Sequence, residues 1–341
     1  MAFDLPSAVD VLVVGGGPAG LSAATWLGRY QRSTVVVDAG QQRNLSAEFA
    51  HGLLGRDPTT PGELLAEARA GLEQYPQVVL HHGRATALRR DEGGLFHATV
   101  DGAEISAERV VLATGVRDQV PEVAGFADHY GIDVHHCPAC DGYAARGQLV
   151  IILGSGMHVP AYAAELLDWA DSVRVVTGTT EPAFDEEQRA VLADYGVEVV
   201  DGVAEALIGA PGALAGVQLA DGELVEGDKV FFSYAHHPTN DLARQLGCEL
   251  DHEGGIAVNG FQLTSVDGVY AAGDITAGLQ LVPIAIGKGA AAGGAPDHWG
   301  GPRPGPADAL VHSALTTTSG QRRNILLLER RGDTIGMITG L

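Results

Sequence analysis

The sequence has few cysteines, few basic residues and no long apolar segment. Three cysteines among 341 residues are too few for the disulfide framework on which small secreted domains depend. No apolar run reaches the ~18 residues of a membrane-spanning helix, and residues 1–7 lack the basic start and apolar core of a signal peptide. We therefore expect a cytoplasmic protein with no membrane partner.

The scarcity of basic residues gives the chain a strong negative charge. Lys and Arg number 21 while Asp and Glu number 43, so the formal net charge is −22. Such a charge repels nucleic acid and anionic surfaces, and we expect no nucleic-acid partner. With 45% hydrophobic and 19% charged residues the composition is typical of a globular protein, and the length suffices for two domains.

A glycine-rich motif near the N-terminus has the surroundings of a dinucleotide site. Residues 11–14 form an apolar run typical of a buried parallel strand, and GGGPAG follows at residues 15–20. A segment rich in small residues, 21–27, indicates a helix, and a second apolar strand at 34–37 ends at Asp38. This acid lies 18 residues beyond the last glycine of the motif, near the ~20 expected for a ribose contact.

A second glycine motif indicates a second unit of the same kind. The apolar run 149–153 is followed by GSGMHV at 154–159, a helix-like stretch and a strand at 173–176. Two further strands, within 110–115 and 269–274, end in small-residue turns that suit the edge of the first unit. If both pack beside that unit, the first domain is built from both ends of the chain.

We predict an α/β fold with two Rossmann-like dinucleotide-binding domains, the second inserted in the first. The first domain is expected at residues 1–118 and 244–341, with an atypical tail at 294–341. The inserted domain is expected at residues 119–243.

Cys137 and Cys140 stand at C-x-x-C spacing, which in a reducing compartment indicates a redox pair or half of a metal site. Zinc would need His135 or His136 as further ligands because the chain has no second C-x-x-C, so we expect no metal. If Cys137 caps a helix, the amide groups there lower the pKa of the exposed thiol. The thiolate is the form that attacks a disulfide.

The chain resembles the low-molecular-weight thioredoxin reductases, which are class II pyridine nucleotide-disulfide oxidoreductases. The two glycine motifs, ATG at 113–115, CPACD at 137–141 and AAGD at 271–274 occur in the order and spacing of that family. The resemblance covers roughly residues 9–293 and implies bound FAD, a homodimer, and an inserted NAD(P)-binding-like domain that carries the redox-active cysteine pair. We assign no role to the Gly/Pro-rich stretch 294–306 or to the apolar segment 325–328.

The resemblance also assigns roles to single residues. Asp141 corresponds to an acid that supports proton transfer during dithiol–flavin exchange, and Asp274 to an acid that binds the ribityl chain. Residues 280–282 would lie near the isoalloxazine. The glycine turn and the helix start after it would hold the pyrophosphate. The predicted cofactor-binding residues are Gly15, Gly17, Pro18, Ala19, Gly20, Asp38, Ala113, Thr114, Gly115, Gly273, Asp274, Gln280, Leu281 and Val282.

Three histidines are further candidates. His135 and His136 immediately precede Cys137, and an imidazole there could act as a base. They could equally be two polar loop residues before a helix. We retain both as candidate catalytic residues beside Cys137, Cys140 and Asp141. His51 is a candidate to face the flavin.

The second glycine motif departs from an NADPH site. Its third small position is Val159, followed by Pro160, and a branched side chain there is expected to obstruct close packing over a pyrophosphate. Thioredoxin reductases place arginines after the next strand to hold the 2′-phosphate. This chain has TGTTEP at 177–182, where Glu181 would repel a phosphate. We therefore expect poor binding of NADPH.

Several functions remain open. Residues 51–58 and 61–65, with the spacing from Gln280 to Gly289, look like the dithiol oxidases that close disulfides in gliotoxin and holomycin. There, a small-molecule dithiol reduces the cysteine pair, which reduces FAD, and oxygen accepts the electrons. The alternatives are an NADPH-independent, ferredoxin-linked reductase, an NAD(P)H-dependent reductase with a thioredoxin-like protein partner, and a non-catalytic flavin-binding redox sensor.

Overall fold

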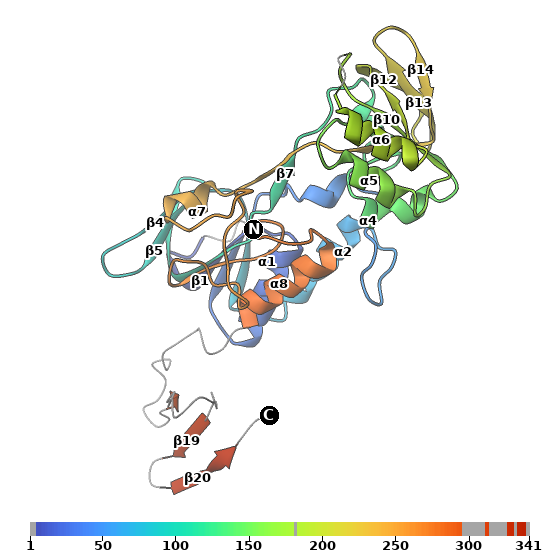
Figure 1. The fold of residues 1–341 in the computed structure, drawn as a ribbon. Coiled ribbons are helices and arrows are strands. Elements are labelled where there is room, and N and C mark those ends of the chain that lie inside the picture. Colours follow the sequence, from blue (N-terminus) through green and yellow to red (C-terminus); the bar gives the residue numbers. More distant parts are fainter. Residues whose placement is uncertain (1–4, 181–182, 295–310, 314–325, 331–332, 339–341) are drawn as a thin grey trace. The chain divides into compact units, whose positions relative to one another are not determined.

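The computed structural model describes residues 5–180, 183–294, 311–313, 326–330 and 333–338. The chain divides into two compact units, Met1–Gly294 and Ala295–Leu341, which are described separately. Figure 1 shows the helices and strands of both units.

A seven-stranded sheet in the first unit is built from both ends of that unit. Its strand order is β3-β2-β1-β6-β5-β4, and β17 pairs with β6. Strands β1, β2, β3, β6 and β17 run parallel, whereas β4 and β5 add an antiparallel edge. The bounds are β1 Ala8–Val14, β2 Thr34–Asp38, β3 Val78–His82, β4 Ala85–Arg90, β5 Phe96–Val100, β6 Ala103–Leu112 and β17 Val269–Ala271.

Small residues allow two helices to pack closely against each other beside this sheet. Helix α1 (Pro18–Arg29) follows β1, and α8 (Val282–Gly294) is the last helix of the unit. A Cβ at Gly289 would lie 2.1 Å from the carbonyl oxygen of Ala19, and one at Gly293 would lie 2.3 Å from that of Ala23. Helices from opposite ends of the unit therefore lie side by side, as Figure 1 shows.

A five-stranded parallel sheet forms the second dinucleotide-type unit. Its order is β11-β10-β9-β15-β8. The strands are β8 Val134–His135, β9 Leu149–Leu153, β10 Ser172–Val176, β11 Glu198–Val200 and β15 Lys229–Phe232, with helices α5 Val159–Leu166 and α6 Glu186–Asp194. An antiparallel group beside it contains β12 Ala204–Ala210, β13 Ala213–Leu219 and β14 Leu224–Glu226.

The chain leaves the first sheet after β6 and returns to it at β17, so the second sheet is inserted in the first. The two crossing segments, β7 (Val116–Asp118) and β16 (His236–Pro238), pair with each other in antiparallel register. This arrangement confirms the predicted fold of two Rossmann-like domains, one inserted in the other. The residue limits of the domains stay a prediction.

Short elements complete the first unit. They are η1 Arg43–Ser46, α2 Pro61–Leu72, α3 Phe126–His129, α4 Pro138–Asp141, η2 Gly142–Ala145 and α7 Asp241–Gln245. In the part of the chain that the structure describes, no helix is long and apolar enough to cross a membrane.

The second unit contains three antiparallel strands, β18 (Val311–Ser313), β19 (Leu326–Arg330) and β20 (Asp333–Ile338). Most of the apolar segment noted at 325–328 therefore lies in β19. Residues 295–306 of the Gly/Pro-rich stretch lie outside the described residues.

Candidate functional site

A cavity of about 720 Å³ brings the predicted cofactor residues and the cysteine pair together. Its volume is typical of a cofactor site. Each predicted cofactor-binding residue except Gly20 lines it. The cavity is also lined by all the predicted catalytic residues, namely His135, His136, Cys137, Cys140 and Asp141.

The glycine turn has the geometry of an anion site. Gly15 has φ +115°, and a Cβ there would lie 2.1 Å from the carbonyl oxygen of Ala113. Gly17 caps α1, and the first residues of this helix, Pro18 and Ala19, line the cavity, so the helix N-terminus can bind an anion there. Gly20 lies outside the lining because its Cα packs on Gly15, where a Cβ would be 1.8 Å from the Gly15 carbonyl oxygen. Gly20 thus holds the helix close to the strand.

Asp38 is only 3% exposed, and three hydrogen bonds hold its carboxylate in one orientation. It accepts hydrogen bonds from the Gly40 amide (2.8 Å), Gln42 Nε2 (2.7 Å) and Arg69 Nη2 (2.9 Å). Gln42 Oε1 and Asn44 Nδ2 also lie in this wall, and both atoms are buried without a hydrogen-bond partner among the described residues. Buried polar atoms in proteins are normally paired, so these two fit a polar ligand such as FAD.

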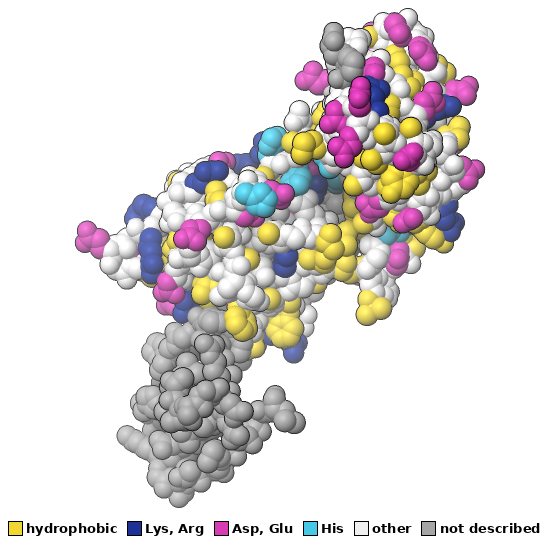
Figure 2. All heavy atoms as spheres, viewed as in Figure 1, with side chains coloured by type: hydrophobic (Ala, Val, Ile, Leu, Met, Phe, Trp, Pro, Cys, Tyr) yellow, Lys and Arg dark blue, Asp and Glu magenta, His cyan; other side chains and the backbone are white. Residues whose placement is uncertain are grey.

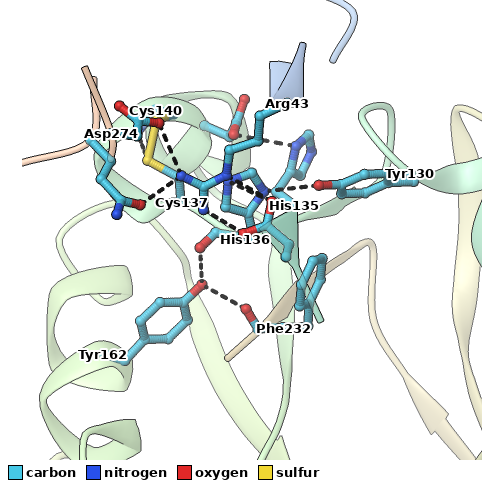
Figure 3. Close-up of a disulfide and its surroundings, with 12 residues drawn as sticks. Arg43, Tyr130, His135, His136, Cys137, Cys140, Tyr162, Phe232 and Asp274 are labelled. Atoms are coloured by element: carbon cyan, nitrogen blue, oxygen red, sulfur yellow. Dashed lines mark hydrogen bonds and ion pairs between the residues drawn. A yellow bond between two sulfur atoms is a disulfide. The ribbon is translucent and has the colours of Figure 1, made fainter. Parts of the chain in front are cut away.

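Arg43 links the two sides of the cavity, and sequence reasoning missed it. Its Nε donates to Asp118 (2.7 Å), and its Nη1 donates to Gln280 Oε1 (2.6 Å) and lies 3.3 Å from Asp274 Oδ2. Figure 3 shows Arg43 near His136 and the disulfide, with Asp274 beside it. Burial lowers the pKa of Arg43, but the hydrogen bonds and charges of Asp118 and then of Asp274 outweigh it and raise that pKa.

Arg43 belongs to no recognisable motif. Only its position in the sequence could have indicated that it lies at the site. It follows Asp38 by five residues, so it stands just beyond the carboxyl end of a parallel strand, where ligands bind in α/β sheets.

Cys137 and Cys140 form a disulfide in the cavity wall, with Cα atoms 5.2 Å apart. Cys137 caps α4, as the sequence predicts, and its Sγ accepts a hydrogen bond from the Cys140 amide at 3.1 Å. An amide that donates to this sulfur also stabilises the thiolate formed when the bond opens.

Asp141 and His135 lie beside the disulfide with opposite pKa shifts. His135 Nδ1 is 3.6 Å from Asp141 Oδ2. Burial raises the pKa of Asp141 to about 6. Burial, followed by the charge of Lys229, lowers the pKa of His135 to about 4. His135 Nε2 is buried without a hydrogen-bond partner among the described residues.

His136 is held from two sides. Its Nδ1 lies 3.2 Å from the Tyr130 hydroxyl, and its backbone carbonyl accepts a hydrogen bond from the Tyr162 hydroxyl at 3.0 Å, as Figure 3 shows. Burial and then the charge of Arg43 lower the pKa of His136 to about 4. Burial, with the charge of Asp118, raises the pKa of Tyr130 to about 12. His136 is therefore a neutral, fixed ring at neutral pH.

An exposed side chain, that of His158, packs on one glycine of the second glycine turn. A Cβ at Gly156 would lie 2.6 Å from Cε1 of His158, so the imidazole covers that glycine. His158 Nε2 also hydrogen-bonds the Ser233 hydroxyl at the end of β15. Val159 is fully buried in the core of this unit with Ile152. Helix α5 therefore packs onto the sheet through Val159, and the effect of Val159 on a bound pyrophosphate stays a prediction.

The end of β10 offers no guanidinium among the described residues 177–180, which are three threonines and a glycine. Thr177 is buried and donates to the Thr179 carbonyl. Arg189 is paired with Asp201 through both carboxylate oxygens, at 2.9 and 2.7 Å. Glu181, expected to repel a phosphate, lies outside the described residues.

The fold and the cavity define a two-domain, dinucleotide-binding disulfide oxidoreductase. Residues 9–289 match the family model described as pyridine nucleotide-disulphide oxidoreductase, and the chain belongs to this family. It binds FAD and is an oxidoreductase.

Named relatives agree with this assignment. The chain is 32% identical over 309 residues to thioredoxin reductase sirT of Leptosphaeria maculans, covering 84% of this chain and 93% of the relative. It is 30% identical over 301 residues to thioredoxin reductase tcpT of Claviceps purpurea, covering 84% and 92%. The crystal structure of HlmI has a TM-score of 0.81 at 33% identity and covers 88% of this chain and 94% of that one.

Proposed function

We propose that this protein is an FAD-dependent dithiol oxidase that closes a disulfide in its substrate and has no competent NADPH site. One contrast carries the proposal. The Cys137–Cys140 disulfide lies in the wall of a cavity that fits FAD, whereas the His158 side chain packs on Gly156 of the second glycine turn.

The exchange step requires only the cysteine pair and the substrate. Two substrate thiols become one disulfide, the Cys137–Cys140 bond breaks, and each released sulfur takes one proton. Asp141, with its pKa raised to about 6, is placed to hold and deliver one of these protons beside the disulfide. When bound, FAD would supply a two-electron acceptor that molecular oxygen reoxidises, giving hydrogen peroxide.

Arg43, Asp274 and Gln280 support binding of the cofactor in this proposal. The glycine turn would hold the pyrophosphate, Asp38 the adenosine ribose, and Asp274 the ribityl chain. Arg43 hydrogen-bonds Gln280 and Asp274, so these groups are oriented before the cofactor binds. Preorganised polar groups lose less entropy on binding.

A small-molecule dithiol is the substrate that we propose. The resemblance of residues 51–58 and 61–65 to the dithiol oxidases of gliotoxin and holomycin favours it, although the relatives named thioredoxin reductase keep a thioredoxin-like protein partner as the alternative. A ferredoxin donor is less favoured because Asp and Glu side chains gather over the part of the chain that carries α5, α6 and β14, as Figure 2 shows, and ferredoxins are themselves usually acidic. A homodimer and a cytoplasmic location also remain predictions.

Anaerobic mixing tests the proposed function. Dithiothreitol should bleach the visible absorbance of the bound flavin, and admission of air should restore it with formation of peroxide. The Cys137→Ser and Cys140→Ser variants should keep the flavin but resist bleaching by dithiol. Fast bleaching by micromolar NADPH would favour an ordinary reductase. A flavin that resists every thiol and nicotinamide would favour a non-catalytic binding protein.

A further inference from the structure

A closed surface loop carries His51 to the cavity that contains the disulfide. The backbones of Ala50 and Thr59 hydrogen-bond to each other at 2.7 and 3.2 Å and close the loop at its base. His51 is the first residue after this closure, and Thr60 caps α2 directly after it. The base of the loop is therefore joined directly to α2, and this connection restrains the backbone position of His51.

Asp57 orients the imidazole of His51. Asp57 Oδ1 lies 3.0 Å from His51 Nδ1, and Asp57 Oδ2 accepts the amide of Gly52 at 3.1 Å. The hydrogen bond from His51 is the largest cause that lowers the pKa of Asp57, so this carboxyl group is an acceptor at neutral pH. A carboxylate acceptor requires the proton on Nδ1, which leaves Nε2 as the basic nitrogen.

His51 differs from the other histidines of the cavity in its contact with solvent. Its side chain is 36% exposed and lines the cavity together with Cys137, Cys140 and Asp141. The charge of His51 lowers the pKa of Asp141, against the larger effect of burial, which places the two side chains within electrostatic reach. His135 and His136 are poor bases because burial has lowered their pKa values to about 4.

We propose that His51 is the general base that takes the proton from the incoming substrate thiol, with Asp57 as its positioning residue. This inference rests on the proposed function. His51 Nε2 takes the proton as the substrate sulfur bonds to one cysteine, and the Cys137–Cys140 bond breaks. The released sulfur takes a proton from Asp141. The second substrate thiol then gives its proton to the Asp141 carboxylate and closes the product disulfide, and the freed cysteine sulfur takes the proton from His51.

Each charged group that faces the ring fits this role. Asp57 contacts Nδ1 from within the loop, and Asp141, on α4, lines the same cavity as the ring. Arg56, next to Asp57, forms an ion pair with Glu67 on α2. Its guanidinium is therefore engaged away from the His51 imidazole. A base held by one carboxylate, with a second carboxyl group in the same cavity as the disulfide, suits paired proton transfers.

The His51→Gln variant tests the proposal, and His97→Gln is the matched control. His97 is also paired with an aspartate, at 2.7 Å from Asp91, but it lies outside the cavity lining. The holoenzyme is mixed anaerobically with dithiothreitol, quenched in acid and alkylated, and mass spectrometry counts the reduced Cys137 and Cys140. This readout is independent of the flavin spectrum. The series covers about pH 6 to 9, and His51→Ala is assayed with and without imidazole.

We expect His51→Gln to slow the exchange by roughly 10²-fold at neutral pH. The loss should shrink as the pH approaches the thiol pKa of ~8.5, because the substrate then ionises without a base. Asp57→Asn should lose about tenfold, and imidazole should restore part of the His51→Ala rate. His97→Gln should match the wild type.

A His51→Gln rate equal to the wild type overturns the inference alone. A decrease in the exchange rate that is the same at every pH also overturns the inference, and so does an equal decrease in His97→Gln. Either result would show that the substitution acts on the structure and not on proton transfer. If the wild-type cysteines stay oxidised in dithiothreitol at every pH, the proposed function itself is wrong.

Discussion

The Nδ1 atom of His135 lies 3.6 Å from the Oδ2 atom of Asp141, and burial acts on both groups in the direction of neutrality. The pKa of His135 falls to about 4 while that of Asp141 rises to about 6. Between these values the proton is on the carboxyl group and the imidazole is neutral. In that pH range the pair is therefore a carboxylic acid beside a neutral ring, the reverse of an ordinary His–Asp ion pair.

Replacing Asp141 by Asn should slow the exchange between dithiol and the cysteine pair by roughly 10²–10⁴-fold, because the leaving sulfur loses its proton donor. The ratio of wild-type to variant rates should fall as the pH rises through about 6, where Asp141 ionises. Rapid mixing with dithiothreitol over a pH series measures the ratio. Equal rates in the two proteins would remove Asp141 from the mechanism.

The same carboxyl group should reduce the stability of the oxidised protein at alkaline pH. Its pKa in the folded state is above its unfolded value, so the folded state binds more protons between about pH 4 and 6, and stability falls as the pH rises through this window. A shift of about two units corresponds to about 3 kcal/mol. Near pH 8 the free energy of unfolding of Asp141→Asn should exceed that of the wild type by about 3 kcal/mol, and near pH 4 the two should be equal. Urea unfolding at each pH measures this difference.

His135 should act in the opposite direction. Its pKa is lowered to about 4, so below its ordinary value the unfolded state binds a proton that the folded state does not. Stability contributed by the neutral ring is lost as the pH falls from about 6.5 to 4, by roughly 3 kcal/mol. In His135→Gln the free energy of unfolding should depend less on pH between about 6.5 and 4, whether or not the variant is less stable at neutral pH. An unchanged slope would show that the ring is readily protonated in the folded protein.

The sequence predicted the parts of the site that recur as motifs. The glycine turn, Asp38 and the cysteine pair follow from local spacing, because a strand, a tight turn and a helix N-terminus are specified within a few residues. The contacts of Arg43 with Asp118 and Gln280 join distant segments, which spacing does not encode. Asp57 is only six residues from His51, but no motif marks their hydrogen bond. The contact of His158 with Gly156 depends on a side-chain rotamer, which the sequence alone does not specify.

Arg43 should be essential for the integrity of the cofactor cavity. Its partners Asp118 and Asp274 have side chains only 10% and 22% exposed, so Arg43→Gln leaves two largely buried carboxylates without their counter-charge. Removal of one partner from a buried ion pair costs roughly 3–5 kcal/mol. Thermal unfolding and titration with FAD should both show the loss. Arg89→Gln is the control, since Arg89 and Glu104 are each 59% exposed and should contribute less than about 1 kcal/mol.

NADPH should reduce this flavin poorly. The His158 imidazole covers the turn that would receive the pyrophosphate, and residues 177–180 offer the 2′-phosphate no guanidinium. Charge-assisted contacts contribute ~1.5–3 kcal/mol each, so loss of two weakens binding by roughly 10²–10⁴-fold. Stopped-flow mixing with NADPH should show little bleaching at micromolar concentration, while dithiothreitol bleaches the same sample.

Restoring the missing groups provides the reciprocal test. His158→Ala uncovers Gly156, and Thr180→Arg places a guanidinium on an exposed position after β10. The double variant should bind NADPH more tightly than either single variant. It should prefer NADPH to NADH because only NADPH carries the 2′-phosphate that the introduced arginine is meant to bind. Fluorescence titration with each nucleotide measures both effects. Tight NADPH binding by the wild type would refute the argument directly, since neither substitution would then be needed.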